Sequence, residues 1–346
     1  MKKKSLFLFF FFLIIVAFVF YSIFCLYIPV FSKNTEEIRV EIPSGTSTRK
    51  IASILKEKNL IRSENYFYLA SRIPVLFGRK SAYSLKSGVY MVKPSMSNIQ
   101  ILELLESGRQ EYIKTVIPEG LTKTKIAEIL EMKGVCSKED FLQSCYDKNL
   151  LLKYEIPGEN FEGFLFPDTY FFTPKMSSDD VIEIMVKNFF EKIQEILPLK
   201  DKKNQELYDV VILASIVERE YRVEEEAPLI ASVFTNRIED NVGLYSCATI
   251  EYIITEILGR PHPDVITYDD LKIDSPFNTY KWAGLTPGPI SNPGFVALKA
   301  ASFPPKTNYY YFTLTDSSKG THTFSTSFKS HTSAGVQFKT KKAASN

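Results

Sequence analysis

The sequence predicts an α+β protein with an N-terminal membrane-spanning helix, two small β-α-α-β-α modules in its first half and a mixed α+β domain in its second half. Three observations support this fold class. An uncharged apolar run occupies Ser5–Phe31, and a strand-then-helix pattern at Val40–Leu55 returns at Val116–Leu130. The residues of the range 200–340 combine helical periodicity with a hairpin pattern, and we expect them to form a separate catalytic domain.

The apolar run is long enough to cross a bilayer. At ~1.5 Å of rise per residue it spans a hydrocarbon core of about 30 Å, whereas the apolar part of a signal peptide has about 7–15 residues. No small-residue cleavage motif follows it, and the residues before Cys25 are too bulky for a lipoprotein signal. We therefore expect residues 1–4 to be a cytoplasmic tail and residues 5–31 a single-pass helix in the cytoplasmic membrane. Lys2–Lys4 should hold the N-terminus inside and place the rest on the outer, periplasmic side. A buried core helix is the alternative, which the absence of a polar face disfavours.

The composition indicates a folded chain and argues against one class of partner. Hydrophobic residues make up 45% of the sequence, and the formal net charge is +2. The charges form no basic stripe, which argues against nucleic acid. Beyond the apolar run, Cys136, Cys145 and Cys247 form an odd set without metal-ligand spacing. A Cys136–Cys145 disulfide is one interpretation, and unpaired core thiols are the favoured one.

An internal duplication organises the first half. Each copy has a strand broken by Pro and Gly, then a helix with Ile and Leu at helical spacing. Tyr90–Ser97 also returns as Tyr170–Ser177, a strand ended by Pro with Ser placed to cap the next helix. Residues 38–110 and 112–195 therefore read as two copies of one β-α-α-β-α unit. This unit resembles a LysM module, which implies binding of N-acetylglucosamine-containing glycans; for the first copy, a spacer is an equal alternative.

The helical pattern from Glu206 to Tyr221 carries the main candidate for chemistry. It is apolar around its whole circumference until Glu218, which shares a stripe with Val211 and Ala214. Burial raises the pKa of a carboxyl, and a carboxylic acid still protonated near neutral pH can donate a proton to a leaving oxygen, as glycosidic cleavage requires. A structural ion pair with an arginine is the alternative.

The segment Ser275–Gly294 is rich in Pro and Gly, as expected of a stiff, shaped surface loop. Asn278, Tyr280 and Trp282 offer amide, hydroxyl and aromatic surfaces that suit a sugar. Asn292 is expected to cap the helix that follows. A rigid connector without a binding role is the alternative interpretation of the loop.

Residues Tyr309–Thr313 and Thr321–Phe324 predict a hairpin, with His322 and Phe324 on one face by strand alternation. Zinc chemistry would need a ligand set assembled from His322, His331 and Glu218. No His-Glu-x-x-His pattern occurs, so neither a metal site nor a cofactor is expected.

Seven motifs follow one another along the chain. They are IPEG at Ile117–Gly120, EGFLFPDTY at Glu162–Tyr170, SIVERE at Ser215–Glu220, ASVFTNR at Ala231–Arg237, SPFNTY at Ser275–Tyr280, GLTPGPI at Gly284–Ile290 and GTHTF at Gly320–Phe324. In this order they resemble the YceG-like (MltG) family of endolytic murein transglycosylases, and the resemblance covers nearly the whole chain.

The resemblance implies cleavage of the MurNAc-GlcNAc bond of nascent peptidoglycan glycan strands, without water. Glu218 corresponds to the family's single acid/base, and Glu220 is the second choice. The acid protonates the leaving oxygen and then takes a proton from the C6 hydroxyl of the same sugar, which attacks C1 and closes a 1,6-anhydro ring. Such cleavage would end strand elongation. The residues expected to bind substrate are Ser215, Glu220, Thr249, Asn278, Tyr280, His322 and Phe324.

The implied partners are the glycan strands, the cytoplasmic membrane, and peptidoglycan synthases (penicillin-binding proteins). The sequence departs from the family in one place: Tyr245 stands where the family usually has Gln, and Cys247 where it has Asp. A neutral thiol cannot replace the electrostatic role of a carboxylate, so the resemblance does not determine the reaction rate or the substrate preference of this protein.

Two other functions remain open at this stage. A hydrolytic muramidase would need a second carboxylate at about 6.5–9.5 Å from the acid, or about 5–5.5 Å in a retaining enzyme. Glu220, Glu224 and Glu251 are its candidates when Glu218 is the acid. A non-catalytic scaffold would bind glycan through the LysM-like modules and recruit wall-synthesis enzymes without cleaving strands.

Overall fold

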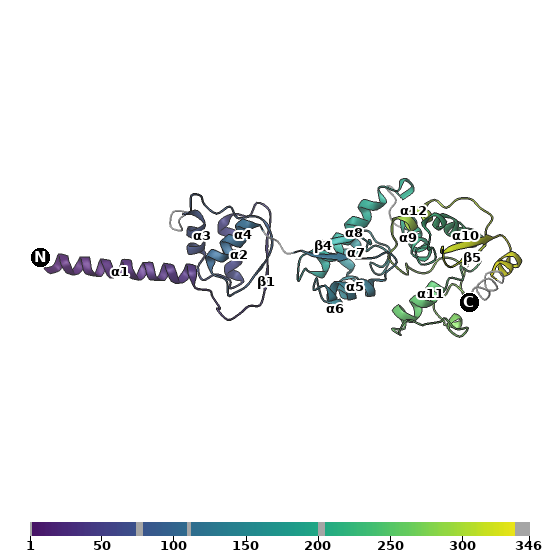
Figure 1. Cartoon of the computed structure of the whole chain (residues 1–346), viewed down its shortest axis with the longest axis horizontal. Coiled ribbons are helices and arrows are strands. Elements are labelled where there is room, and N and C mark those ends of the chain that lie inside the picture. Colours follow the sequence, from purple (N-terminus) through teal and green to yellow (C-terminus); the bar gives the residue numbers. More distant parts are fainter. Residues whose placement is uncertain (1, 74–78, 109–111, 200–204, 336–346) are drawn as a thin grey trace. The chain divides into compact units, whose positions relative to one another are not determined.

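The computed structural model describes residues 2–73, 79–108, 112–199 and 205–335, which form two compact units (Figure 1). Unit 1 is Met1–Ile113 with Thr173–Lys175, and unit 2 is Lys114–Phe172 with Met176–Asn346. Mixed α+β structure is confirmed. Residues 74–78 and 109–110 of the first predicted module, and 200–204 and 336–340 of the predicted C-terminal domain, lie outside the described residues.

Unit 1 consists of one long helix and a small α+β module. Its elements are α1 (Lys2–Tyr27), β1 (Ile38–Ile42), α2 (Thr48–Glu57), α3 (Glu64–Arg72), β2 (Gly88–Val92) and α4 (Asn98–Ser107). Strands β1 and β2 pair antiparallel, with Val40 opposite Tyr90. The three short helices pack around a core that includes Leu55, Phe67 and Leu102, all fully buried.

Among the described residues, α1 contains the one stretch long and apolar enough to cross a membrane, Phe9–Tyr27. The predicted run continued to Phe31, but the helix ends at Tyr27 because Pro29 has no amide hydrogen and disfavours helical backbone in the residue before it. The end of α1 packs on the module: Arg62 donates to the Pro29 carbonyl at 2.6 Å, and the Tyr21 and Tyr66 rings meet edge to face.

Unit 2 begins with a second strand-and-helix segment and continues into a larger helical domain. Its elements are β3 (Ile113–Val116), α5 (Lys123–Met132), α6 (Lys138–Ser144), α7 (Lys148–Lys153), β4 (Thr169–Phe172), α8 (Ser178–Ile193), η2 (Leu197–Leu199), α9 (Gln205–Val217), η3 (Glu224–Glu226), α10 (Ala227–Glu239), α11 (Cys247–Tyr252), η4 (Ile253–Ile257), η5 (Asp270–Lys272), α12 (Phe295–Ser302), β5 (Tyr311–Asp316) and β6 (Thr321–Ser325). Strands β3 and β4 form one two-stranded sheet, and β5 and β6 form another.

The two predicted copies share the element order β-α-α-β-α, and the second has α7 in addition. Equivalent positions behave alike. Gly45 and Gly120 have φ of 77° and 74°, and the Tyr90 and Tyr170 hydroxyls each donate to the carbonyl four residues earlier. Ser97 and Ser177 cap α4 and α8 as expected. Superposition of the copies stays a prediction, and the second copy is part of unit 2 rather than a separate body.

Helix α9 is the centre of unit 2. It packs against α10 and α12, as Figure 1 shows, and every residue from Val211 to Val217 is buried. The α-helix ends at Val217 and not at Tyr221, because the hydrogen bonds of Arg219 and Glu220 span three residues instead of four. Arg219 N–H donates to the Ile216 carbonyl, and Glu220 N–H donates to the Val217 carbonyl. Glu220 therefore lies on a tightened final turn, whereas the Glu218 N–H keeps the helical bond to the Ala214 carbonyl, four residues back.

The segment predicted as a surface loop runs in its second half through the interior. Residues from Gly288 to Gly294 are buried, since they bond to α9 and to the EGFLFPDTY segment. Ile290 N–H donates to Ser215 Oγ at 3.0 Å, and Ser291 Oγ donates to the Ser215 carbonyl at 2.9 Å. Backbone groups in a buried segment cannot bond to water and need partners within the protein. These contacts supply such partners.

Asn292 does not cap the next helix; its amide joins three segments instead. Its Oδ1 accepts from the Gly163 and Leu165 amides at 2.8 and 2.9 Å, and its Nδ2 donates to the Leu121 carbonyl at 2.9 Å and to Glu162 Oε1 at 2.8 Å. Helix α12 starts later, with Gly294 as its N-cap. Every donor and acceptor of this fully buried amide is therefore used across the chain.

All four cysteines are free in the structure. Cys145 is buried and Cys136 is partly buried, so neither forms the disulfide that was the less favoured alternative. Burial raises the pKa of the Cys145 thiol well above its usual range, as expected of an unreactive core residue.

We expect Asn292→Ala to destabilise unit 2 by about 3 kcal/mol or more, because it leaves several buried backbone groups without partners at ~1–3 kcal/mol each. Asn308→Ala, at an exposed position, should stay within about 0.5 kcal/mol of the parent. Urea unfolding monitored by circular dichroism measures both. Equal midpoints for the two variants would contradict the role given to Asn292.

Candidate active site

Glu218 lies at the junction of α9 and α12. Its Oε2 accepts the Gly294 N–H at 2.9 Å, at the N-terminus of α12, and its Oε1 accepts the Tyr221 hydroxyl at 3.1 Å. Burial raises the pKa of Glu218 to about 7, although these two hydrogen bonds act in the other direction. The raised pKa agrees with the sequence prediction. Both carboxyl oxygens, however, already accept hydrogen bonds from other parts of the protein.

The IPEG turn lies against this junction. A Cβ added at Gly120 would lie 3.4 Å from Glu218 Cγ, and one added at Gly294 would lie 2.0 Å from Glu119 Oε1. The Gly120 N–H also donates to the Asn292 carbonyl at 2.9 Å. Partial burial and the nearby Glu224 carboxylate raise the pKa of Glu119 above its ordinary value. The Glu218 side chain is thus packed beneath a tight turn.

Glu220 lines a cavity of about 480 Å³ on another side of the same turn. Ser246 Oγ donates to its Oε1 at 2.5 Å. In the part of the chain that the structure describes, no hydrogen bond reaches its Oε2. Burial raises the pKa of Glu220 to about 7, the nearby Glu251 carboxylate adds to the rise, and the Ser246 hydrogen bond opposes it.

The rest of this cavity is aromatic and polar. Its other lining residues are Phe234, Arg237, Leu244, Tyr245, Ser246, Cys247, Tyr280, Tyr311, Phe312, Phe328 and His331. The Tyr280 hydroxyl lies 3.1 Å from Cys247 Sγ, and the Tyr245 and Tyr280 rings are 5.6 Å apart. Apolar walls with a few convergent polar groups and an acid of raised pKa are typical of a ligand site.

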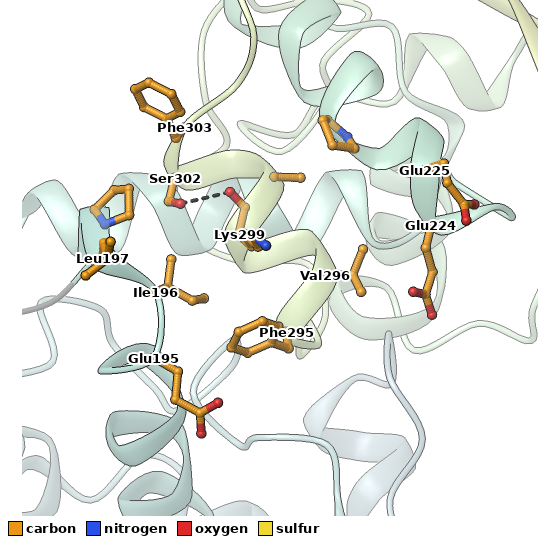
Figure 2. Close-up of a pocket in the computed structure, with 13 residues that line it drawn as sticks. Glu195, Ile196, Leu197, Glu224, Glu225, Phe295, Val296, Lys299, Ser302 and Phe303 are labelled. Carbon is orange, nitrogen blue, oxygen red and sulfur yellow. Dashed lines mark hydrogen bonds between the residues drawn. The ribbon is translucent and has the colours of Figure 1, made fainter.

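A second cavity, of about 730 Å³, lies beside α12 and is shown in Figure 2. Phe295, Val296 and Phe303 give it an apolar wall, and Glu195, Glu224 and Lys299 lie at its borders in the view. Neither Glu218 nor Glu220 lines this cavity.

Three of the predicted substrate-binding residues are internal supports of the site. Ser215 and Asn278 are fully buried; Asn278 Nδ2 donates to the carbonyls of Leu271 and Ile273. Thr249 Oγ1 bonds to the Ser246 carbonyl and to Thr279 Oγ1. These side chains hold α9, α11 and the SPFNTY segment in place, and direct sugar contact by them stays a prediction.

The other predicted residues divide between the cavity and the hairpin. Glu220 and Tyr280 line the cavity. The predicted hairpin is present as β5 and β6, but the rings of His322 and Phe324 both pack against Phe312, and neither lines the cavity. The His322 ring and backbone N–H both bond to the Glu226 carboxylate, which ties the hairpin to the start of α10.

Several cavity residues were not chosen from the sequence as binding residues. Arg237 ends the ASVFTNR motif and Tyr245 and Cys247 mark the departure from the family, so a signal was present for these three. Tyr311 and His331 belong to no binding motif, because only tertiary folding brings them to the cavity at Glu220. In the described ranges, no group of three or more His, Cys, Asp and Glu side chains could hold a metal ion.

Comparison with known proteins completes the description of the site. A family model described as the YceG-like family matches residues 40–337. The chain belongs to the YceG-like family. A relative from Bacillus subtilis (strain 168), named endolytic murein transglycosylase, is 32% identical over 326 residues, covering 90% of this chain and 87% of the relative.

More distant and structural relatives agree. An endolytic murein transglycosylase of Streptococcus pneumoniae (strain D39) is 26% identical over 315 residues, which cover 82% of this chain and 55% of the relative. The crystal structure of a yceG-like protein from Listeria monocytogenes has a TM-score of 0.56 and 32% identity, covering 86% of this chain and 99% of that one. The Listeria protein thus shares both sequence similarity and the fold with this chain.

The buried carboxyls predict how stability depends on pH. The pKa values of Glu162, Glu218 and Glu220 rise from an ordinary 4.5 to about 7 through burial. Between these values the folded chain keeps protons that the unfolded chain releases, so raising the pH favours unfolding. His331, whose pKa is lowered by burial, opposes this trend as a single group.

The thermal midpoint should therefore fall from pH 5 to pH 7 and level off above about pH 7.5. Scanning calorimetry of the full chain in detergent checks this. Glu220→Gln, which removes one of the three titrations, should make the fall smaller. A midpoint that rises over this range would contradict the burial of these carboxyls.

Proposed function

We propose that this YceG-like protein is an endolytic peptidoglycan lytic transglycosylase that cleaves the MurNAc-GlcNAc bond and leaves 1,6-anhydroMurNAc ends. The names of the Bacillus and Streptococcus relatives support the reaction. The observation that carries the proposal is the carboxyl of Glu220, which has a raised pKa and lines an aromatic, polar cavity.

We assign the acid/base role to Glu220 in preference to Glu218. Both carboxyls have a pKa of about 7, so the pKa does not separate them. The surroundings of their oxygens support Glu220. Glu218 lines neither cavity, and its two oxygens accept hydrogen bonds from Gly294 and Tyr221. Glu220 instead lines a cavity that can hold a sugar. A general acid must come within hydrogen-bond reach of the leaving oxygen.

The mechanism follows from one carboxyl acting twice. Ser246 donates to Glu220 Oε1 and leaves Oε2 to carry the proton that passes to the leaving oxygen. The resulting carboxylate, still hydrogen-bonded to Ser246, accepts the proton of the C6 hydroxyl as that oxygen attacks C1. Because the nucleophile belongs to the same sugar, no second carboxylate is needed to position water. The nearby Glu251 is paired with Arg219 at 2.7 Å.

Glu220→Gln should abolish release of anhydro-ended muropeptides while the chain stays folded, because Gln keeps the size of the side chain but cannot transfer a proton. The loss should be about 10⁴-fold or more, the upper end for general acid/base help, since one residue serves both steps. Mass spectrometry of glycan strands treated with each variant measures it, because anhydro products are lighter than hydrolysis products by one water.

Glu218→Gln is the matched comparison, and we expect it to keep most of the activity and lose some stability. A dead Glu218→Gln beside an active Glu220→Gln would return the acid role to Glu218. Reducing-end products without anhydro forms would replace the transglycosylase by a hydrolytic muramidase. Binding without cleavage by the parent chain would favour the scaffold.

We also propose that α1 anchors the protein in the cytoplasmic membrane with unit 2 outside. The 19 residues of Phe9–Tyr27 approach the thickness of a hydrocarbon core of about 30 Å, and three lysines precede them. An anchored enzyme would meet strands as they emerge from membrane-bound synthases, so we propose that it ends elongation beside penicillin-binding proteins. Unit 1 would bind glycan as a LysM-like module or set the height of unit 2, and its β-α-α-β-α order supports either role.

Protease added outside spheroplasts should digest residues after Phe31, while a tag placed before Lys2 survives. The expectation rests on the apolar helix and the lysines before it. Immunoblotting for the tag and for unit 2 gives the result. Full protection of unit 2 in intact spheroplasts, with digestion after lysis, would exclude the outward orientation.

A further inference from the structure

Tyr245 has an unusual backbone conformation at the mouth of the Glu220 cavity. Its φ is 51°, in the left-handed region that suits Gly and, less often, Asn. A bulky side chain adopts this conformation only at an energetic cost that the surrounding structure must offset. Such strain directs attention to what the side chain does in that place.

The surroundings hold the Tyr245 ring in one position. Its N–H donates to the Thr279 carbonyl at 3.2 Å, and a Cβ added at Gly243 would lie 3.0 Å from Tyr245 Cε1, so the ring rests on a residue without a side chain. The Tyr280 ring lies 5.6 Å away, and the Arg237 guanidinium lies 5.6 Å from the Tyr245 ring centre. The backbone and ring supports fix the ring before any ligand arrives.

This fixed ring remains available to a ligand. Tyr245 is 49% exposed, and it lines the same cavity as Glu220, next to Cys247 and Tyr280. The face of an aromatic ring is electronegative and apolar, which suits the C–H face of a pyranose. Tyrosine also supplies a large contact area at low cost in side-chain entropy.

We propose that Tyr245 is a substrate-positioning residue whose ring stacks on one N-acetylhexosamine unit of the glycan beside Glu220. The inference rests on the function proposed above and adds to it the residue that sets the affinity of this sugar subsite. The left-handed backbone of Tyr245 directs its ring towards the cavity, and the backbone strain is the energetic cost of this orientation.

The test separates the ring from the fold. Asn tolerates a positive φ, so Tyr245→Asn should leave the thermal midpoint unchanged or raise it while removing the ring. With a β-1,4-linked GlcNAc pentamer as the probe, calorimetric titration of the full chain in detergent should show affinity roughly 3- to 10-fold weaker for Tyr245→Asn. Tyr245→Phe keeps the ring and should bind as the parent does.

Tyr268→Asn is the matched control, because Tyr268 is 85% exposed and does not line the cavity. Unchanged affinity in Tyr245→Asn, or no binding of the probe by the parent, would overturn the proposal. A fall of several degrees in the midpoint together with the loss of affinity would also overturn it, since it would make the role structural.

The probe contains no MurNAc, so binding is measured without turnover. Loss of probe affinity in Tyr245→Asn, combined with a parent that does not cleave glycan strands, would reject the proposed reaction and keep the stacking residue. On strands that are cleaved, Tyr245→Asn should raise KM by a similar factor and leave kcat close to that of the parent.

Discussion

The Asn292 side chain is the constraint on which unit 2 depends. Its amide is buried and bonds to Gly163, Leu165, Leu121 and Glu162. One side chain therefore satisfies polar groups of the EGFLFPDTY motif and of Leu121, which follows the IPEG motif. Two residues later, Gly294 begins α12 and donates its N–H to Glu218. Because a buried amide must satisfy all its hydrogen bonds, the position of the loop, the start of α12 and the end of α9 are set together.

At the end of α9, two carboxyls with similar pKa values lie in different surroundings. Glu218 points towards the α12 backbone and the IPEG turn, and the tightened turn directs Glu220 towards Ser246 and the aromatic cavity. Burial raises both pKa values, yet a proton donor also needs an open space in front of it. The proposed acid/base role of Glu220 therefore rests on the neighbours of each oxygen and not on the pKa values, which are alike.

The site contains groups held at a local energetic cost. Glu220 is desolvated, and Tyr245 holds a left-handed backbone conformation where most residues would not. The supports around them are fully paired: Asn278, Thr249 and Thr279 form a hydrogen-bonded frame beneath the cavity. A rigid frame that maintains strained or desolvated groups is the arrangement expected where a protein binds and cleaves its substrate.

Local patterns in the sequence determined the apolar helix, the β-α-α-β-α order of both copies, the hairpin and the buried helix that precedes Glu218, because these depend on periodicity, caps and turn residues. Tertiary structure decided the rest. The left-handed backbone of Tyr245 depends on packing rather than pattern. The proposed choice of Glu220 over Glu218 depends on the groups that the fold brings to each carboxyl. The Gly294 N–H and the Ser246 hydroxyl lie far from them in the sequence, so no local spacing predicts these contacts. Tyr311 and His331 reach the cavity for the same reason, since long-range packing places them there.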